Sequence, residues 1–391
     1  MRTGRHPMSA EAPDPGIEIR PVSGRRDFKA FLKLPWRIYR EDPHWVPPLL
    51  SEVAKVLDRS KHPFHAHAEV EYYLARRRGE VVGRVAASVN HRFNEFQQTR
   101  IGDFGFFECV DDADVAGALL DAAESWSRKH GMTVLQGPFN FSTNDELCSP
   151  GVLVEGFEHP PVLMMGHTPP YYAGLLEACG FVKSKDLLSY WVEVEAPPAR
   201  LLRGIARLRG RRKVVLRPLN LKDLDGDIRR IKEIYHSAWE RNWGFVPMTD
   251  AELDHMASSL KPVLNPRFCV IAEIQGKPVG FALQLPDLNQ AFAHLNGRLV
   301  PLGWLKFLWY KRRIDRARVL TLGVKPGYRR MGLDTMLILH LFNESLKAGY
   351  PRGECAWILE DNMPMRRGLE RIGGQVYKVY RVFERPVLGS G

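Results

Sequence analysis

Cysteine is scarce in this chain of 391 residues, and long apolar runs are missing. The five cysteines are scattered and form no C-x-x-C pair, so neither a disulfide framework nor a cysteine zinc site is predicted. No stretch reaches the roughly 18 consecutive apolar residues that a membrane-spanning helix needs. Residues 1–15 are polar and proline-rich, unlike a secretory signal. We therefore expect a disordered leader over residues 1–15 and a cytoplasmic protein.

The remaining composition is typical of a folded protein, with 45% hydrophobic and 26% charged residues. The length predicts two or three domains. A formal net charge of +11 favours an anionic partner. Nucleic acid, an acidic membrane surface and a polyphosphate-bearing cofactor all meet this condition, and charge alone does not choose between them.

An internal repeat indicates two copies of one fold. Arg20 in IEIRPV corresponds to Arg217 in VVLRPL, an offset of 197 residues, and Gly79 corresponds to Gly276 at the same offset. Such self-similarity is the mark of a duplicated unit. We expect the first copy over residues 16–195 and the second over residues 214–391, joined by a basic linker over residues 196–213.

Each copy shows the same order of expected elements. A strand and a helical region precede a hairpin in which two apolar runs flank a glycine turn, and a further strand leads into a long helix. Strands mixed with helices in this way predict a mixed β-sheet flanked by helices in each copy. The fold class is therefore α/β (α+β).

The clearest chemistry lies at the junction ARVLTLGVKPGYRRMGLD, residues 317–334, where a strand runs into a basic turn and then a helix. Amide groups at a helix N-terminus have no partner within the helix and lie at the positive end of its dipole, so such a turn binds phosphate. Arg329 and Arg330 add positive charge, and Gly332 lets the backbone approach a ligand closely. A charged turn without a ligand is the alternative.

This junction resembles the GNAT superfamily of acyl-CoA-dependent N-acyltransferases, whose signature is a strand followed by Arg/Gln-x-x-Gly-x-Gly/Ala at a helix start. Arg329 and Gly332 stand at the first two positions, whereas Asp334 stands at the third, where a carboxylate repels a pyrophosphate unless it is turned outward or paired. The resemblance implies two GNAT-like mixed-sheet domains in tandem, with acyl-CoA bound by the second and no metal. The implied cofactor-binding residues are Gly323, Val324, Arg329, Arg330, Met331, Gly332, Leu333 and Asn362.

Two further departures from the family pattern concern the first copy and the leaving thiolate. The first copy has Asp111, Asp112 and Asp114 at the equivalent turn, and three carboxylates exclude a pyrophosphate. We therefore expect a degenerate, non-catalytic first copy that helps to build the acceptor pocket. Leu369 stands where many members place a Tyr as general acid, so another group or water must protonate the sulfur.

The amine must lose a proton, which requires a carboxylate or His within reach. In the second copy Asp287, His294 and Glu360 are the polar groups nearest the expected cleft. In the first copy Asn144 and Glu146 lie in a polar loop, where functional groups are often displayed. Surface, capping or turn-forming roles are the alternative for each of these five residues. The aromatic residues Trp239, Trp243 and Phe245 could form an acceptor-pocket wall or pack in the core.

Two other segments stand out. His62, His65 and His67 near Glu69 suggest a metal site with two histidines on one strand face, but no second ligand cluster accompanies them and no metal is expected. Residues 299–313 combine an apolar, aromatic body with a cationic end, the pattern of an interfacial helix. A peripheral membrane contact at the inner face or a lipid-facing substrate entrance would explain it, and a core helix or a dimer contact would do so equally.

These observations favour an acyl-CoA-dependent N-acyltransferase whose acceptor is a long-chain, sphingoid-type lipid amine. Among tandem GNAT proteins the chain is most similar in kind to bacterial ceramide synthases. An acetyltransferase for a small polar amine is the alternative enzyme. A non-catalytic acyl-CoA sensor or a basic nucleic-acid-binding module is the alternative of another class, although no recognition motif for nucleic acid accompanies the basic linker.

Overall fold

The computed structural model describes residues 16–145, 147–193, 203, 206–207, 210, 213–240 and 242–387. The first half contains strands β1 (Ile17–Pro21), β2 (Ala68–Arg77), β3 (Glu80–Asn90), β4 (Ile101–Cys109), β5 (Val134–Gly137), β6 (Val152–Glu155) and β7 (Val182–Glu193). Its helices are α1 (Gly24–Lys33), α2 (Pro35–Ile38), α3 (Leu50–Leu57), η1 (Pro63–Ala66), α4 (His91–Gln97), α5 (Ala113–Lys129) and α6 (Tyr172–Ala178). The expected hairpin and long helix are both present.

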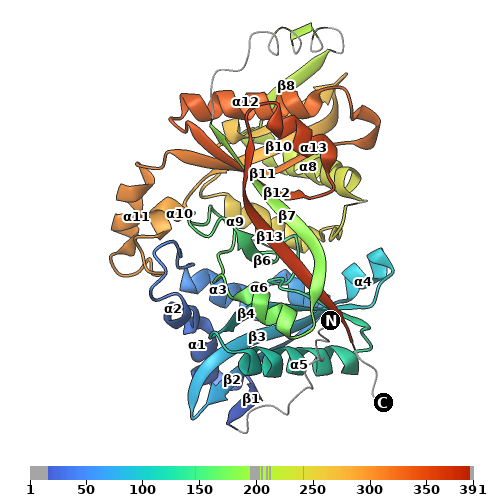
Figure 1. Cartoon of the computed structure of the whole chain (residues 1–391). Coiled ribbons are helices and arrows are strands. Elements are labelled where there is room, and N and C mark those ends of the chain that lie inside the picture. The colour runs from blue at the N-terminus through green and yellow to red at the C-terminus, as the bar shows by residue number, and fades with distance from the viewer. Residues whose placement is uncertain are drawn as a thin grey trace, which may run out of the picture.

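The second half repeats this order (Figure 1). Its strands are β8 (Val214–Pro218), β9 (Cys269–Ile274), β10 (Lys277–Pro286), β11 (Arg316–Val324), β12 (Arg352–Leu359) and β13 (Gln375–Pro386). Its helices are η2 (Leu221–Asp223), α8 (Leu224–Trp239), α9 (Asp250–Leu260), η3 (Pro266–Phe268), α10 (Asn289–Phe292), α11 (Gly303–Lys311), η4 (Pro326–Tyr328), α12 (Leu333–Lys347) and α13 (Met363–Glu370). The mixed α/β class is confirmed.

All described strands join in one sheet, in which the two halves exchange their last strands. The strand order is β1-β2-β3-β4-β5-β13-β7-β12-β11-β10-β9-β8, with β6 paired to β13. Strand β13 of the second half therefore pairs with β5 of the first, and β7 of the first pairs with β12 of the second. The halves cannot separate without breaking these backbone ladders, while the domain boundaries given above stay a prediction.

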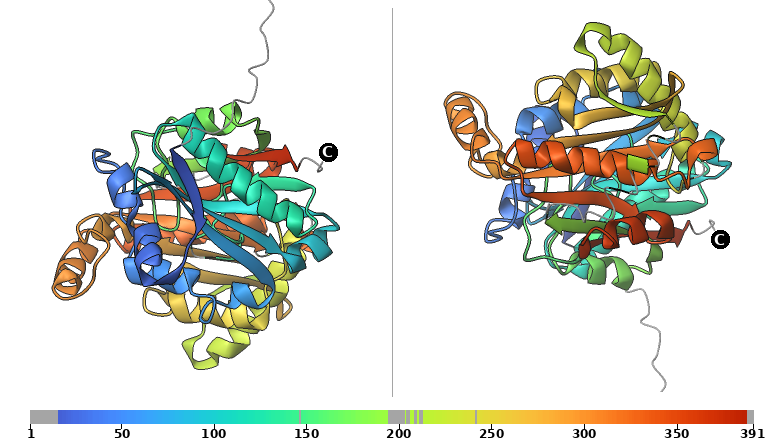
Figure 2. Two further views of the ribbon diagram at one scale, coloured as in Figure 1. Left: turned by 90° about the horizontal axis from the view of Figure 1, so that it is seen from below. Right: turned by 90° about the horizontal axis from the view of Figure 1, so that it is seen from above.

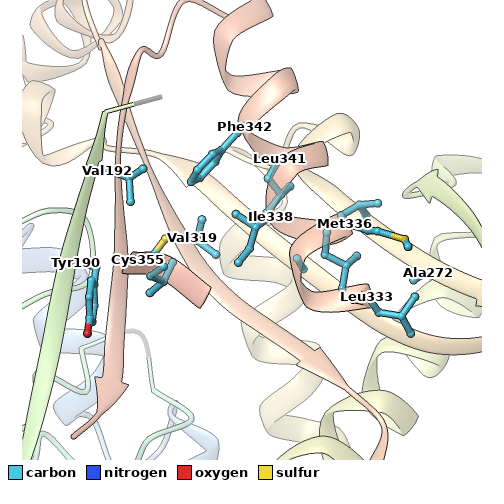
Figure 3. Close-up of a cluster of buried hydrophobic side chains, with 14 of the residues drawn as sticks. Tyr190, Val192, Ala272, Val319, Leu333, Met336, Ile338, Leu341, Phe342 and Cys355 are labelled. Atoms are coloured by element: carbon cyan, nitrogen blue, oxygen red, sulfur yellow. The ribbon is translucent and has the colours of Figure 1, made fainter. Parts of the chain in front are cut away.

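Each half has its own core around the helix that follows its fourth strand. In the first half α5 covers the sheet with Val115, Leu119 and Leu120 fully buried. In the second half α12 places Leu333, Leu337 and Leu341 against the sheet, where Tyr190 and Val192 of the exchanged strand β7 join them (Figure 3). The core of the second half is thus completed by a strand of the first half.

The predicted strand face shared by two histidines is wrong. His65 lies in the short helix η1 and His67 precedes β2, so the two histidines do not share a strand face. Proline at position 63 favours a helical first turn here.

Candidate functional site

The candidate site is a gap between β11 and β12. These parallel strands pair only from Arg316 to Val319 and from Arg352 to Cys355. Beyond that point β12 stays with β7, since Ile358 pairs with Leu188, whereas β11 stays with β10, since Gly323 pairs with Phe281. Two strands that each keep their outer neighbour must diverge, so their inner edges face an opening.

Gly323 and Val324 differ in the edge to which they turn their amides. The amide of Lys325 donates to Val279 of β10, and amides alternate between the two edges of a strand. The amide of Gly323 therefore belongs to the β10 ladder, and the amide of Val324 faces the gap. Gly323 is needed for space, because a Cβ there would lie 2.2 Å from the ring of Trp239.

The turn after β11 presents unpaired amides. Arg330 and Gly332 both adopt positive φ, 63° and 73°, and Gly332 caps α12 without a side-chain hydrogen bond. Within the described chain, the amides of residues 330–334 donate to no other group. Backbone that alternates in this way forms an anion-binding concavity, so the turn that carries Met331 and Leu333 fits a phosphate group.

The equivalent turn of the first half is closed by its own side chain. The carboxylate of Asp112 accepts hydrogen bonds at 3.1 Å from the amides of Asp114 and Val115 at the start of α5. It also pairs with Arg77 at 2.7 Å. The amides that would hold an anion are already used, which supports the expected degenerate character of this copy.

The side chain of Arg329 does not extend freely into solvent. It donates to the carbonyl oxygen of Ala238 at 2.5 Å and to that of Val324 at 3.3 Å. Ala238 lies in the last turn of α8, whose carbonyls have no partner within the helix. Arg329 therefore joins the end of α8 to the end of β11, although both Arg329 and Arg330 are exposed.

A cavity of about 280 Å³ continues from the gap into the space between the halves. Its walls come from the inner edges of β11 and β12, from α8 and α9, and from the polar loop of the first half. Trp239, Trp243 and Phe245 all line it, as does Asn362, which caps α13 by accepting from Met365. Leu369 lines the same space and is buried in the core.

The three predicted catalytic residues of the second half do not line this cavity. Asp287 is fully buried, accepts from the amide of Leu163 in the first half and pairs with Arg316 at 2.9 Å. Burial raises the pKa of Asp287 to about 6, against the lowering effect of Arg316. Glu360 pairs with Lys183 at 2.6 Å, and the exposed His294 stacks on Tyr310. The two carboxylates join the halves, and all three catalytic roles stay untested predictions.

The polar loop of the first half does reach the cavity. Asn144 itself does not line the cavity. It is buried, accepts from the hydroxyl of Tyr235 at 2.9 Å and donates to the carbonyl of Val246, so it holds Tyr235 in the cavity wall. Glu146 lies outside the described residues. Sequence reasoning missed Asp145 between them, whose position in the same loop was the available signal; it lines the cavity and pairs with the buried His62 at 3.2 Å.

The described part of the chain contains no group of three His, Cys, Asp or Glu side chains placed to hold a metal ion. Nor does any described helix combine the length and apolarity that crossing a membrane requires.

Known proteins share both the sequence and the tandem arrangement. The acetyltransferase (GNAT) family model matches residues 228–373. A protein of Caulobacter vibrioides named bacterial ceramide synthase is 36% identical over 97% of this chain and 100% of its own, and protein YghO of Escherichia coli is 35% identical over 94% and 95%.

Solved structures agree in fold. A tandem GNAT protein from the clavulanic acid biosynthesis pathway matches with a TM-score of 0.57 at 15% identity, covering 96% of this chain and 100% of its own. A GCN5-related N-acetyltransferase of Sphaerobacter thermophilus matches with a TM-score of 0.55 at 14% identity, covering 97% and 98%. The chain belongs to the GNAT family and is an N-acyltransferase built from two GNAT-like halves in tandem.

Proposed function

We propose that this N-acyltransferase takes a long acyl chain from acyl-CoA and transfers it to the amine of a sphingoid-type lipid. The observation that carries this proposal is the character of the cavity. Its described lining is mostly aliphatic and aromatic, with Met248, Met256 and Leu260 opposite the strand edges. An apolar chamber that opens from the strand gap suits alkyl chains better than a small polar amine. The 36% identity to a protein named bacterial ceramide synthase supports the same substrate class.

The cofactor is proposed to lie along the gap, with its pyrophosphate on the turn of residues 329–333. The unpaired amides of residues 330–334 fit this group, and the amide of Val324 faces the gap where the thioester carbonyl would accept a hydrogen bond. Asp334 lies in the first turn of α12 and is partly exposed, so water screens its charge. Acyl-CoA supplies an activated thioester, and the protein positions it and the amine.

The test is a matrix of acyl donors and amine acceptors. We expect kcat/KM for transfer to sphinganine to rise from acetyl-CoA to palmitoyl-CoA, by about threefold to fourfold for each methylene that the cavity buries. Leu260→Trp should shift the preference to shorter chains because it fills the cavity, whereas Leu346→Trp on the exposed side of α12 should not. Equal activity with acetyl-CoA and small polar amines would instead support the acetyltransferase alternative.

A second part of the proposal concerns residues 299–313, which we infer to contact an anionic membrane surface. Trp304, Leu305, Leu308 and Trp309 in α11 are each 49–52% exposed, and at 100° per residue they occupy one arc of the helix. The helix lies at the outer side of the molecule in both views of Figure 2. An apolar arc of this kind rarely stays uncovered in water.

The charges around this arc favour lipid over a second protein copy. Lys306, Lys311 and Arg312 are exposed beside it, and Arg313 lies 3.7 Å from the ring of Trp309. The base of the segment is held by the first half, where Trp36 donates to Asn296 at 2.6 Å. A fixed segment that exposes aromatic and cationic side chains together is typical of an interfacial membrane anchor.

Vesicle binding tests this part separately. Sedimentation with phosphatidylglycerol-containing vesicles should retain the wild type, and Trp304→Ser with Leu308→Ser should abolish retention. Lys311→Gln should weaken retention by about fivefold, whereas Leu221→Ser, which removes a leucine elsewhere that is 62% exposed, should not. The membrane assignment would be contradicted if the wild type were not retained and instead formed a concentration-dependent dimer that Trp304→Ser disrupts.

The basic linker that supports a nucleic-acid alternative lies largely outside the described residues.

A further inference from the structure

N-acyl transfer to an amine needs a group that removes a proton from the substrate. An alkylammonium ion has no lone pair, so it attacks a thioester only after it loses a proton. The acceptor of that proton must border the space that the amine occupies. Among the described residues that line the cavity, Asp145 is the only carboxylate and His236 is the only imidazole.

His236 is poorly placed to accept the proton. It lies in the last turn of α8, where burial and then the positive charge of Lys232 lower its pKa, more than a hydrogen bond with the backbone of Met248 and the charge of Asp250 raise it. Its Nε2 atom is buried without a partner in the described chain. Burial and the nearby ammonium group of Lys232 disfavour an imidazolium there, so His236 is disfavoured as the base.

Asp145 is held in a fixed orientation. Its Oδ2 atom accepts from the amide of Ser142 at 2.8 Å, and its own amide donates to the carbonyl of Ser142 at 3.1 Å. Its Oδ1 atom lies 3.2 Å from Nε2 of His62. Both side chains are almost completely buried. A carboxylate that is oriented by a turn and paired with an imidazole has the geometry of a proton acceptor with a second group behind it.

Behind Asp145, a line of imidazoles leads away from the cavity. The rings of His62 and His255 of α9 are 4.8 Å apart, nearly perpendicular to each other, and His255 is partly exposed. His65 of η1 lies 6.3 Å from His62 on another side. Charged groups near this cluster include Asp58 and Arg59, which act on His65, and the pair of His67 with Glu252 at 3.1 Å. Lys232 and Arg318 line the same cavity as Asp145.

We propose that Asp145 accepts the proton of the substrate ammonium group and that His62 positions Asp145 and passes the proton towards His255. The neutral amine then forms its bond to the carbonyl carbon as the carbon–sulfur bond breaks. The attacking nitrogen loses a second proton, and the thiolate takes one up. Overall, ammonium and thioester give amide, free thiol and one released proton, so the equation balances. The assignment rests on the proposed lipid-amine reaction only for the identity of the amine.

Asp145→Asn is the direct test, with palmitoyl-CoA and sphinganine as substrates. We expect kcat to fall at least 100-fold with KM changed less than threefold. Rising pH should rescue the variant, with kcat/KM increasing tenfold per pH unit below the pKa of the amine, because solvent then supplies the neutral amine. His62→Gln should show a smaller loss of kcat than Asp145→Asn. The acidic limb of its profile of kcat/KM against pH should be displaced. A purely structural role would not produce pH rescue.

The matched control is a second buried His–Asp pair away from the cavity. His167 lies 2.8 Å from Asp42, and neither residue lines the cavity. Asp42→Asn should keep the wild-type pH profile even if it lowers stability. Wild-type activity of Asp145→Asn, or the same loss without pH rescue, would overturn the proposal; should that variant not fold, an unaltered pH profile of His62→Gln would overturn it.

A measurement without turnover separates this proposal from the substrate assignment. In histidine-labelled protein saturated with free coenzyme A, sphinganine should move the imidazole NMR signals of His62 in the wild type but not in Asp145→Asn. If no amine is acylated yet His62 responds, the substrate assignment fails and the proton path stands. If amines are acylated and His62 does not respond, the proton path fails.

Discussion

Replacing Gly323 by alanine tests how tightly the wall of the cavity is packed. A Cβ at this position would lie 2.2 Å from two ring carbons of Trp239 and 3.1 Å from the Cβ of Ala238, whereas carbon atoms rest about 3.5–4.0 Å apart. The indole must therefore withdraw by about 1.5 Å. Tyr235 and Phe281 pack on it, with ring centroids 4.9 Å and 5.9 Å away, so the displacement must pass to them or into the cavity.

Overpacking of this kind costs about 1–3 kcal/mol. We expect urea denaturation of Gly323→Ala to give a free energy of unfolding about 2 kcal/mol below the wild type. Because Trp239 lines the cavity, KM for the amine should rise in the same variant. Trp239→Phe removes the part of the indole that the new Cβ meets. The double variant Gly323→Ala with Trp239→Phe should therefore recover at least half of the stability that Gly323→Ala loses.

Gly174→Ala is the matched control. Gly174 lies in helix α6, and a Cβ there meets nothing within 4 Å, so alanine should stabilise the protein by up to about 1 kcal/mol. Wild-type stability of Gly323→Ala would refute the packing argument. So would a double variant with Trp239→Phe that is no more stable than Gly323→Ala alone.

Three other expectations follow. Gly332→Ala and Gly349→Ala each force alanine to positive φ at opposite ends of α12, 73° and 84°, and each should cost about 1–2 kcal/mol. Calorimetric titration with coenzyme A should show about a tenfold weakening for Gly332→Ala only, and equal losses would contradict the phosphate turn. Burial raises the pKa of Asp103 to about 8; the folded state then holds a proton that the unfolded chain releases, so stability falls as pH rises from about 4 to 8. Asp103→Asn should remove this dependence of stability on pH and raise the free energy of unfolding at pH 7 by up to about 4 kcal/mol. Thermal melts of the variant that still show the decrease from pH 4 to 8 would contradict this prediction. Burial alone raises the pKa of Asp186, but hydrogen bonds from Arg381 and Lys183 lower it overall, so Asp186→Asn should destabilise at pH 7 and lose that effect as pH falls below about 4.

Much of the fold could be predicted from the sequence because its signals are local. The glycine turns at Gly79 and Gly276 adopt positive φ, 84° and 75°, as a tight hairpin requires. The order of strands and helices followed from periodicity. The exchange of β7 and β13 could not be predicted this way, because both are 12-residue strands and both halves offer a similar free edge. Which edge each strand joins depends on contacts between residues far apart in the chain.

The site was predicted less completely, for a physical reason. Asp287 and Glu360 carry titratable groups at the ends of strands that border the site, and the sequence alone does not tell whether such a group faces a cavity or another segment. Here the amide of Leu163 and the ammonium group of Lys183 occupy them. The loop that contains Asn144 was identified as functional in character, but the choice of Asp145 required knowing which side of that loop faces the second half.

The first half has filled its own strand gap with its own chain. Strands β4 and β5 pair only from Ile101 to Asp103, and then Phe139 donates to the carbonyl of Phe104 while Asn140 accepts from the amide of Phe106, both at 2.7 Å. The loop that follows this segment contributes Thr143, Asp145 and Cys148 to the cavity of the other half. If the first copy binds no cofactor, as the sequence predicts, the segment that closes its strand gap is also the segment that supplies a cavity wall to the other half.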